Sequence, residues 1–347
     1  MATRNSKGAA KSSSGDRSLD IAVDVGRSSV KIAFLNRTMS FPFLVATKKA
    51  ATADYFVSTS AIRKVATVDG APYFFGEDAT LFGDSVIQYT EGDIFREASV
   101  AVTLFSIAYA MYEGDAEQPK VNLAINLTFD NFYQKEAYAK ALKGKHSVKF
   151  TVEDETFDFF VDRVFVLYQG FSGLISTAMD DAFHVNKNFL PTEGVVIDVG
   201  RQTIDFLYIE RFVVKHGSSK DFGTFKIYEK AVDLLKREHS IIKEPYEIEE
   251  LLSTGKAITP LHGGDKVHVE PLIKKAVAFY FSDVQLHFET FLSKKNPDYI
   301  LLLGGGAIVY GPFFKEKYKI VEIPAEPQFS NSRGMLKFLA KAVQVKS

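Results

Sequence analysis

The chain has 347 residues, enough for two domains with separate cores, and its 46% hydrophobic and 24% charged residues are ordinary for a globular protein. The formal net charge of −1 argues against a strongly basic nucleic-acid-binding surface, and the absence of cysteine excludes disulfides, thiolate metal sites and cysteine nucleophiles. No run approaches the roughly 18 apolar residues that cross a bilayer, so we expect no membrane span and a cytoplasmic protein.

The chain begins with a serine-rich segment and continues with apolar strands. Residues 1–17 are small and polar and lack the apolar centre of a secretory signal, so we expect a flexible tail. A transit peptide or an artificial leader is the alternative interpretation. Strands are predicted at Leu19–Val25, Val30–Leu35 and Ser40–Val45. This strand–turn–strand opening differs from the strand–turn–helix opening of a dinucleotide-binding fold.

A small surface subdomain is predicted at about residues 50–95. Within it, Thr67–Phe75 has the pattern of a β-hairpin with Asp69-Gly70 at the turn. The next segment, Glu97–Tyr112, has apolar residues at the helical period, which predicts a helix that faces a core. That helix carries no candidate catalytic group.

The remaining chain alternates strands with helices. Before residue 191 we predict strands at 121–127 and 161–167, a hairpin of 147–150 with 156–160, and helices at 132–142 and 171–179. A turn-rich break at Pro191–Gly194 is the best candidate for a domain boundary. After it we predict a helix from about 224 to 237, a charged segment at 244–250, a loop at 261–265, helices at 273–292 and 332–343, and a strand buried on both faces at 299–303. The alternation predicts an α/β fold.

One stretch occurs twice in the chain. IAVDVGRSSVKIAF at residues 21–34 aligns with VVIDVGRQTIDFLY at residues 195–208, so Asp24 corresponds to Asp198 and Gly26 to Gly200. A duplication at this distance is too long for a solenoid repeat and indicates two related half-molecules. Each copy has the pattern of a buried strand, a carboxylate, a glycine turn and a return strand. Two such hairpins that face each other would clamp a phosphate group.

The carboxylates and turns suit phosphate and metal binding. Asp24 and Asp198 can orient a hydrated Mg²⁺, and the turns Gly26–Ser29 and Gly200–Thr203 can offer backbone amides to phosphate oxygens. Two ordinary β-turns with capping aspartates are the alternative, which the duplication weakens.

The two copies are not equivalent at every position. Lys31 on the first return strand could reach a phosphate as a point charge, whereas its counterpart is Asp205. A solvated strand lysine is the alternative. Arg27 and Arg201 lie at the turn tips, where we expect solvent exposure.

A glycine-rich turn follows the buried strand at 299–303. Gly304-Gly305-Gly306 precedes an apolar helix start, a pattern suited to a nucleotide near a helix N-terminus. The turn is weak evidence alone. The chain contains no GxxxxGK[ST] motif, and the glycine run lacks the third glycine of a dinucleotide fingerprint.

The order of these motifs resembles a known superfamily. IAVDVGRSSVKIAF, YQG at residues 168–170, GVVIDVGRQTIDF and ILLLGGGAIVYG together resemble the five-motif ATPase core of actins, sugar kinases and heat-shock chaperones. Within it, the chain looks most like the ParM-type plasmid-segregating bacterial actins, by length, by GGGA, by LLSTGK and by the closing NSRGMLKF helix. The resemblance covers roughly residues 19–343.

The resemblance implies a duplicated, ribonuclease H-like α/β fold with a nucleotide in the interdomain cleft. Domain I would span residues 18–190, with the small subdomain at about 50–95 and the C-terminal helix 331–347 packed back on it. Domain II would span residues 191–330, with a small subdomain at about 225–275.

The resemblance also implies roles for individual residues. Asp24 and Asp198 would hold Mg²⁺ through water, and Gln169 would position the attacking water, since a glutamine is a poor proton acceptor. A strand-end amide that bonds its own backbone is the alternative for Gln169. The remaining nucleotide-binding candidates are Gly26, Arg27, Ser28, Ser29, Lys31, Gly200, Gln202, Thr203, Gly304, Gly305, Gly306 and, on the helix at 230–237 that would wall the base pocket, Lys230.

The implied function is a polymerising ATPase, with ATP or ADP and Mg²⁺ as ligands and GTP left open. Its filaments would segregate plasmid DNA through a DNA-binding adaptor of ParR type, so DNA contact would be indirect. One departure is Asn126–Asp130 in place of a glycine-leucine-proline motif, and we expect it to leave the nucleotide clamp untouched. A small-molecule kinase of the same fold and a non-polymerising, ATP-gated scaffold are the alternatives.

Overall fold

The computed structural model describes most of the chain. The described residues are 18–47, 64–79, 86–87, 92–114, 120–180, 182, 184–186, 189, 192–259, 265–293 and 295–344. The predicted tail at 1–17, Pro191 of the predicted boundary and most of the predicted loop at 261–265 lie outside them, as does much of the predicted subdomain at 50–95.

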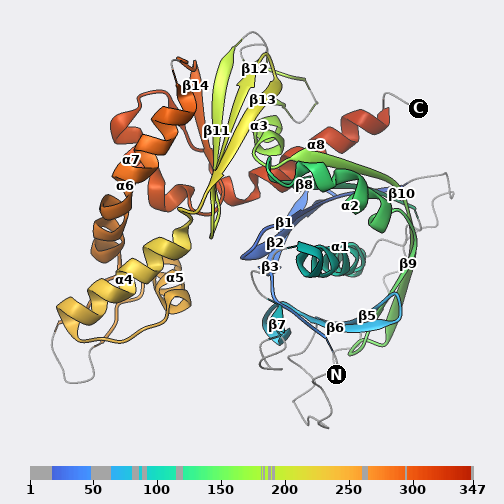
Figure 1. Cartoon of the computed structure of the whole chain (residues 1–347). Helices are drawn as coiled ribbons and strands as arrows, with labels where there is room; N and C mark the ends of the chain where they lie inside the picture. The colour runs from blue at the N-terminus through green and yellow to red at the C-terminus, as the bar shows by residue number, and fades with distance from the viewer. Residues whose placement is uncertain are drawn as a thin grey trace.

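The first half of the chain is built on a sheet that opens with an antiparallel meander (Figure 1). The meander consists of β1 (Leu19–Val25), β2 (Ser29–Phe34) and β3 (Arg37–Pro42). The strands β8 (Lys120–Leu127) and β10 (Glu155–Tyr168) continue the sheet parallel to β1. The central strand β1 is buried along most of its length, which explains its nearly continuous apolar sequence.

The same sheet continues beyond β10 to ten strands. The added strands, in spatial order, are β9 (Gly144–Phe150), β5 (Val65–Val68), β6 (Ala71–Phe75), β4 (Val45–Thr47) and β7 (Val86–Ile87). The predicted hairpin with Asp69 and Gly70 at its turn is confirmed, and both residues have positive φ. Pairing of β5 with β9 joins the strands of the predicted small subdomain to the main sheet.

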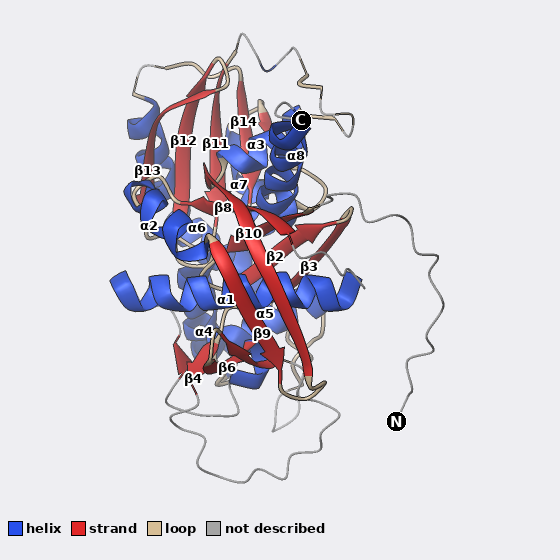
Figure 2. Ribbon diagram, turned by 90° about the vertical axis from the view of Figure 1, so that its right-hand side faces the viewer, coloured by secondary structure: helices blue, strands red, loops and turns tan. Residues whose placement is uncertain are grey.

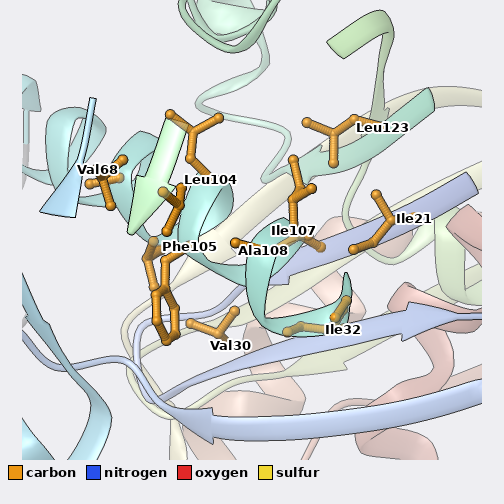
Figure 3. Packing of buried hydrophobic residues seen from close by; sticks show 14 of the residues in the cluster. Ile21, Val30, Ile32, Val68, Leu104, Phe105, Ile107, Ala108 and Leu123 are labelled. Atoms are coloured by element: carbon orange, nitrogen blue, oxygen red, sulfur yellow. The ribbon is translucent and has the colours of Figure 1, made fainter. Parts of the chain in front are cut away.

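One long helix lies inside this curved sheet. α1 (Gly92–Gly114) is seen end-on in Figure 1, with strands around it. Its side chains Leu104, Phe105 and Ile107 are buried, and Figure 3 shows them packed toward the sheet residues Ile21, Val30, Ile32 and Leu123. A helix that is apolar nearly all round is stable only when it is covered on all sides.

Two elements between residues 120 and 180 correct or refine the expectations. The predicted hairpin strand at 156–160 and the strand at 161–167 form one strand, β10, with an irregularity between Val161 and Arg163. The predicted helix at 132–142 begins with a 3₁₀ turn, η3 (Phe132–Gln134), before α2 (Lys135–Leu142). The next helix is α3 (Phe171–Ala178).

The second half repeats the topology of the first. Its sheet contains β11 (Glu193–Val199), β12 (Ile204–Glu210), β13 (Val213–Lys220), β14 (Tyr299–Leu303) and β15 (Val321–Glu322). The spatial order β13-β12-β11-β14-β15 matches β3-β2-β1-β8-β10, with antiparallel pairs on one side of the central strand and parallel pairs on the other. The duplication in the sequence is therefore also a duplication of the fold.

Four helices lie on the second sheet or extend from it: α4 (Thr224–His239), α5 (Pro245–Thr254), α6 (Glu270–Leu292) and α7 (Ala307–Lys317). Most of the charged segment at 244–250 is helix α5, where no helix was predicted. Glu244 and Glu247 form a capping box at its start. None of the described helices is long and apolar enough to cross a membrane.

The last helix returns to the first sheet. After the 3₁₀ turn η5 (Pro327–Phe329), α8 (Ser330–Gln344) packs against α3, β1, β2 and β8, and Figures 1 and 2 both show it beside α3. Met335 and Leu339 join a core cluster with alanines of β1, β2 and β8. The helices approach closely at Gly334, where an added Cβ would lie 1.7 Å from the backbone oxygen of Ser172.

We predict that Gly334→Ala destabilises the protein by about 3 kcal/mol, because a backbone oxygen cannot move aside as a side chain can. Gly311→Ala on α7 is the matched control, since its Cβ would meet the flexible end of Ile323 and the gain in helix propensity is about 1 kcal/mol. Urea unfolding measures both changes. Equal stability of the Gly334→Ala variant and the wild type would contradict this packing.

Candidate functional site

A cavity of about 1070 Å³ lies where the two halves of the molecule meet. Its lining comes from the turn between β1 and β2, the equivalent turn between β11 and β12, the turn after β10 and the turn after β14. In sheets of this kind, ligands bind beyond the carboxyl ends of the parallel strands, and these turns lie at such ends.

The two equivalent turns have the same internal hydrogen bond. The Gly26 amide donates to the Ser29 carbonyl at 3.1 Å, and the Gly200 amide donates to the Thr203 carbonyl at 2.9 Å. The amides of Gly26 and Gly200 are therefore engaged within the turns. The predicted residues of these turns and their return strands that line the cavity are Gly26, Arg27, Ser28, Ser29, Lys31, Gly200, Gln202 and Thr203.

Asp24 and Asp198 end the two central strands, and both line the cavity. They are 2% and 3% exposed, so their carboxylates are largely removed from water. Burial raises the pKa of Asp24, while the nearby Lys31 acts in the opposite direction; the Lys31 Nζ lies 3.9 Å from Asp24 Oδ2. Burial also raises the pKa of Asp198, and the charge of Asp24 adds to the increase.

The carboxylates fit a divalent cation. Asp24 Oδ1 is buried and has no hydrogen-bond partner among the described residues, and such an atom is costly unless something occupies its lone pairs. No group of three or more acidic, histidine or cysteine ligands occurs within the part of the chain that the structure describes. Mg²⁺ suits such a site, because it commonly takes one or two carboxylates and completes its shell with water and phosphate oxygens.

Asp205 is a third buried carboxylate at the cavity, and its role was not predicted. It pairs with Asp198 across the two strands, as Lys31 pairs with Asp24 in the first copy. The Thr203 hydroxyl donates to Asp205 Oδ2 at 3.0 Å, whereas Oδ1 is buried without a hydrogen-bond partner among the described residues. Burial raises the pKa of Asp205 to about 7, and the charge of Asp198 adds to the increase.

Gln169 lies in the turn after β10, and it lines the cavity. Its backbone N–H donates to the Leu127 carbonyl at 2.8 Å, and this hydrogen bond joins the turn to the end of β8. A hydrogen bond from its side chain lowers the pKa of Asp198, against the larger effect of burial. The side chain therefore lies near the Asp198 carboxylate.

The glycine run after β14 packs against the end of β11. Gly304 has φ of +80°, and an added Cβ would lie 2.4 Å from Asp198 Oδ1, so a side chain is excluded there. The Gly306 amide donates to the Val199 carbonyl at 3.0 Å. Gly305 differs from both, because a Cβ there would meet nothing within 4 Å.

The first turns of α4 form another wall of the cavity. The amides of Thr224 and Phe225 donate to carbonyls of the second turn, at Gly200 and Arg201. The lining residues of α4 are Thr224, Phe225, Lys226, Tyr228 and Glu229. These residues come directly before the segment 230–237, which was predicted as the wall of the base pocket.

Lys230 in particular is not among the residues that line the cavity. Its Nζ lies 3.3 Å from Asp233 Oδ2 and 4.4 Å from the centre of the Phe279 ring.

The two turn-tip arginines differ from the expectation of solvent exposure. Arg27 donates from Nη1 to Gln202 Oε1, so the two turns touch across the cavity. Arg201 Nη1 lies 2.7 Å from Glu249 Oε2 on α5, and the Arg201 side chain is only 13% exposed. Glu249 escaped prediction because α5 was not recognised as a helix.

Residues 126–130 also contradict an expectation. They were expected to leave the clamp untouched, yet Asn126, Leu127, Thr128 and Asp130 line the cavity. The departure from the glycine-leucine-proline motif therefore changes the wall of the site itself.

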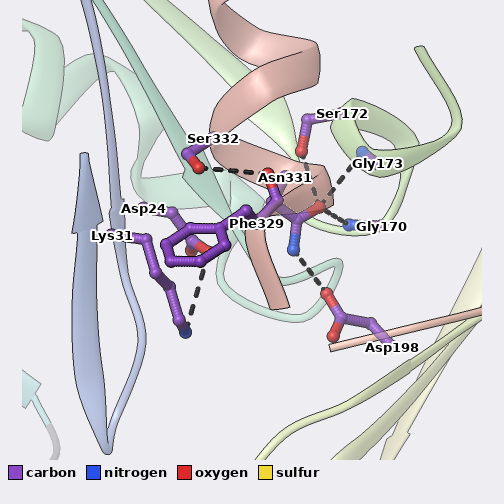
Figure 4. A network of polar contacts seen from close by, with 9 residues as sticks. All are labelled: Asp24, Lys31, Gly170, Ser172, Gly173, Asp198, Phe329, Asn331 and Ser332. Atoms are coloured by element: carbon purple, nitrogen blue, oxygen red, sulfur yellow. Dashed lines mark hydrogen bonds and ion pairs between the residues drawn. The ribbon is translucent and has the colours of Figure 1, made fainter. Parts of the chain in front are cut away.

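Asn331 is another cavity residue that was not predicted. Figure 4 shows its side chain between Asp198 and the start of α3. The segment NSRGMLKF pointed to a helix, but nothing in its pattern marked the asparagine as buried.

We predict that Asp205→Asn flattens the pH dependence of stability in the ligand-free, Mg²⁺-free protein. Folded Asp205 holds its proton up to a pKa of about 7, whereas the unfolded carboxyl releases it near 3.8, so the free energy of unfolding falls as pH rises between these values. Removing this group should reduce the fall between pH 5 and pH 8 by about 2.5 kcal/mol.

Urea unfolding at several pH values measures this difference. Asp154→Asn is the control, because Asp154 is an exposed turn residue whose pKa the Lys149 hydrogen bond lowers instead. A wild-type pH dependence in Asp205→Asn would show that this carboxyl is not buried as described.

Comparisons with known proteins agree with this architecture. A model of the N-terminal domain of actin-like proteins matches residues 22–171. A search of curated protein sequences gives no match.

Solved structures resemble the whole chain. The apo psk41 ParM protein is 19% identical, with a TM-score of 0.74 over 94% of this chain and 98% of that chain. An archaeal actin homologue is 18% identical, with a TM-score of 0.71 over 93% and 99%. Bacillus thuringiensis ParM with AMPPNP is 16% identical, with a TM-score of 0.71 over 95% and 99%. The chain therefore has the two-domain actin-like fold, and its residues 22–171 match the N-terminal domain of actin-like proteins.

Proposed function

We propose that this chain is an actin-like ATPase that binds ATP or ADP with Mg²⁺ in the cavity and forms filaments. One observation carries the proposal: two equivalent turns, each preceded by a buried aspartate, line the same cavity, and the glycine run after β14 lines it too. Bacillus thuringiensis ParM, which has the same fold, has been solved with ADP and with AMPPNP. The proposal extends that ligand to this chain.

The phosphates would lie between the two turns. Amides after Gly26 and Gly200, with the hydroxyls of Ser28, Ser29 and Thr203, would donate to phosphate oxygens. Lys31 would add a positive charge on the side of the first copy only. Arg27 and Gln202, which touch across the cavity, would separate to admit the ligand.

Asp24 and Asp198 would hold Mg²⁺ through its bound waters. The cation would neutralise charge on the transferred phosphoryl group. The cation also fits the protein, because it would satisfy the unpartnered Asp24 Oδ1. The ionised form of Asp24 is favoured by Lys31. The ionised form of Asp198 is favoured by Asn331, Lys31 and Gln169. Both effects would help the carboxylates to bind a cation.

Gln169 would position the water that attacks the terminal phosphate. Its amide can accept and donate hydrogen bonds but cannot take up a proton at neutral pH, so its contribution would be orientation. Its place beside Asp198 puts it on the metal and phosphate side of the cavity.

The nucleoside would lie along Gly304–Gly306 and the first turns of α4. Gly305 is the open position of the run, where a ligand can approach the backbone closely. Tyr228 and Glu229 would border the base, whereas Lys230 does not line the cavity in the ligand-free structure. Whether the chain prefers ATP or GTP can be measured by competition between the two nucleotides for binding.

The filament would be built from head-to-tail contacts, which extend without closure. Several of the structurally similar proteins are named ParM, and on that likeness we propose a cytoplasmic filament that moves plasmid DNA through a ParR-type adaptor. The net charge of −1 agrees with indirect contact to DNA.

We also propose the domain boundaries that the resemblance implies. Domain I would be 18–190, with a small subdomain at about 50–95 and the helix at 331–347; domain II would be 191–330, with a small subdomain at about 225–275. The two sheets, and the packing of α8 on the first of them, support this division.

We expect the purified protein to polymerise with ATP and Mg²⁺, and the polymer to be lost with ADP. Light scattering and negative-stain imaging with ATP, ADP, GTP and a non-hydrolysable analogue test this expectation. If no polymer forms with any nucleotide over a range of salt and Mg²⁺ concentrations, the filament proposal is wrong. Nucleotide turnover without polymer would then point to the kinase or scaffold alternatives.

We expect Asp198→Ala to abolish Mg²⁺-dependent hydrolysis, because the variant lacks one of the two carboxylates. Gln169→Ala should retain nucleotide affinity within about threefold and slow turnover by about 10- to 100-fold, since only water orientation is lost. Phosphate release and titration with a fluorescent ATP analogue measure the two effects. Gln285→Ala, on α6 and bonded to Glu289, is the control. Unchanged turnover in both site variants would overturn the site assignment.

A further inference from the structure

Asn331 is a buried polar residue with a contact on each side of its amide. It lies in the first turn of α8 and is 4% exposed. Its Oδ1 accepts hydrogen bonds from the Gly170 amide at 2.9 Å, the Ser172 hydroxyl at 2.8 Å and the Gly173 amide at 3.1 Å. Its Nδ2 donates to Asp198 Oδ2 at 2.6 Å, as Figure 4 shows.

The chemistry of the partners fixes the orientation of this amide. Backbone amides can only donate, so the atom that faces Gly170 and Gly173 must be the side-chain oxygen. The NH₂ group then necessarily faces Asp198, whose ionised carboxylate can only accept. A rotated amide would place two donors against donors and an oxygen against an oxygen.

On its oxygen side, Asn331 is the N-terminal cap of α3. The residue at the cap position of α3 is Gly170, which has no side chain to offer. The Gly173 amide lies in the first turn of α3, where N–H groups have no partner within the helix. Such an N–H group usually donates to the side chain of the helix's own cap residue. Here the cap comes from another helix, and it holds the turn that begins with Gln169.

On its nitrogen side, Asn331 fixes one oxygen of Asp198. The other oxygen, Oδ1, packs against Gly304, where no side chain fits. The Asn331 hydrogen bond also favours the charged form of Asp198 against the effect of burial. The carboxylate is thus held between an amide donor and a bare backbone.

We infer that Asn331 is a positioning residue that sets Asp198 and the Gln169 turn in one fixed geometry. The inference rests on the proposed function, in which these two residues serve the metal and the attacking water. Because Asn331 belongs to α8, which packs on the first sheet, while Asp198 belongs to the second sheet, its side chain also joins the two halves at the site. The close packing of α8 on α3 at Gly334 holds the backbone of α8 near the Asn331 partners on α3.

Two substitutions separate the two sides of the amide. Asn331→Asp keeps an oxygen for the α3 cap and replaces the donor to Asp198 by an oxygen, with nearly the same shape. Asn331→Ala removes both sides. Ser332→Ala is the matched control, since Ser332 is a buried neighbour whose hydroxyl donates only to the Phe329 carbonyl among the described contacts.

Hydrogen–deuterium exchange without nucleotide tests the capping side. In Asn331→Ala, amides of the peptide 169–175 should exchange at least tenfold faster, whereas Asn331→Asp and Ser332→Ala should stay within about threefold of the wild type. Wild-type exchange at this peptide in Asn331→Ala would overturn the capping role.

Titration with a fluorescent ATP analogue, with Mg²⁺ and with EDTA, tests the Asp198 side. Asn331→Asp should lose about 10- to 100-fold of the affinity that Mg²⁺ adds and about 10- to 100-fold of kcat, with little change in binding in EDTA, as expected for a partner that orients a metal ligand. Ser332→Ala should stay within about twofold. A folded Asn331→Asp variant with wild-type values overturns the inference alone. If the wild type itself binds no nucleotide at any Mg²⁺ concentration, the proposed function fails, and this side of the inference fails with it.

Discussion

Carboxylates that are buried at the ends of two central strands are the constraint on which the rest of the site depends. Asp24 and Asp198 are almost inaccessible to water, and removing a charged group from water is costly unless partners replace the lost hydration. The protein supplies part of that replacement: Lys31 at 3.9 Å and the Asn126 side chain for Asp24, and the side-chain amides of Asn331 and Gln169 for Asp198. In the proposed function, a cation and its phosphate ligands would supply the rest.

Duplication explains why the two carboxylates meet. The same strand order occurs twice, so the same turn occurs twice, and the packing of the two halves brings both turns to one cavity. The copies then differ at the positions that pair with the two aspartates. In register with Asp24 the first copy has Lys31, whereas in register with Asp198 the second has Asp205, an acid of pKa about 7. One side of the cavity is suited to phosphate charge, and the other to a metal and its waters.

The last helix turns two similar halves into one site. α8 follows the second half in the chain but packs on the first sheet, so its first residues pass directly between the two halves (Figure 1). Gly334 lets its backbone approach α3, and Asn331 uses that proximity to cap α3 and hold Asp198. A change in the angle between the halves would have to act on this short set of hydrogen bonds.

The sequence by itself determined the α/β alternation, the central strands and the two aspartates, because apolar periodicity and glycine turns are local signals and because the repeat of DVGR is visible without a structure. It also indicated Gln169 and Gly304–Gly306 as parts of one site. Only the tertiary structure decided that Asp205 is buried, that α4 contributes its first turns and not Lys230, and that residues 126–130 line the cavity. Asn331 is the clearest case, since its partners at Gly170 and Asp198 are distant in sequence and an asparagine near a helix start has no local pattern that marks it as buried. Such contacts depend on how the two halves pack, which no local periodicity encodes.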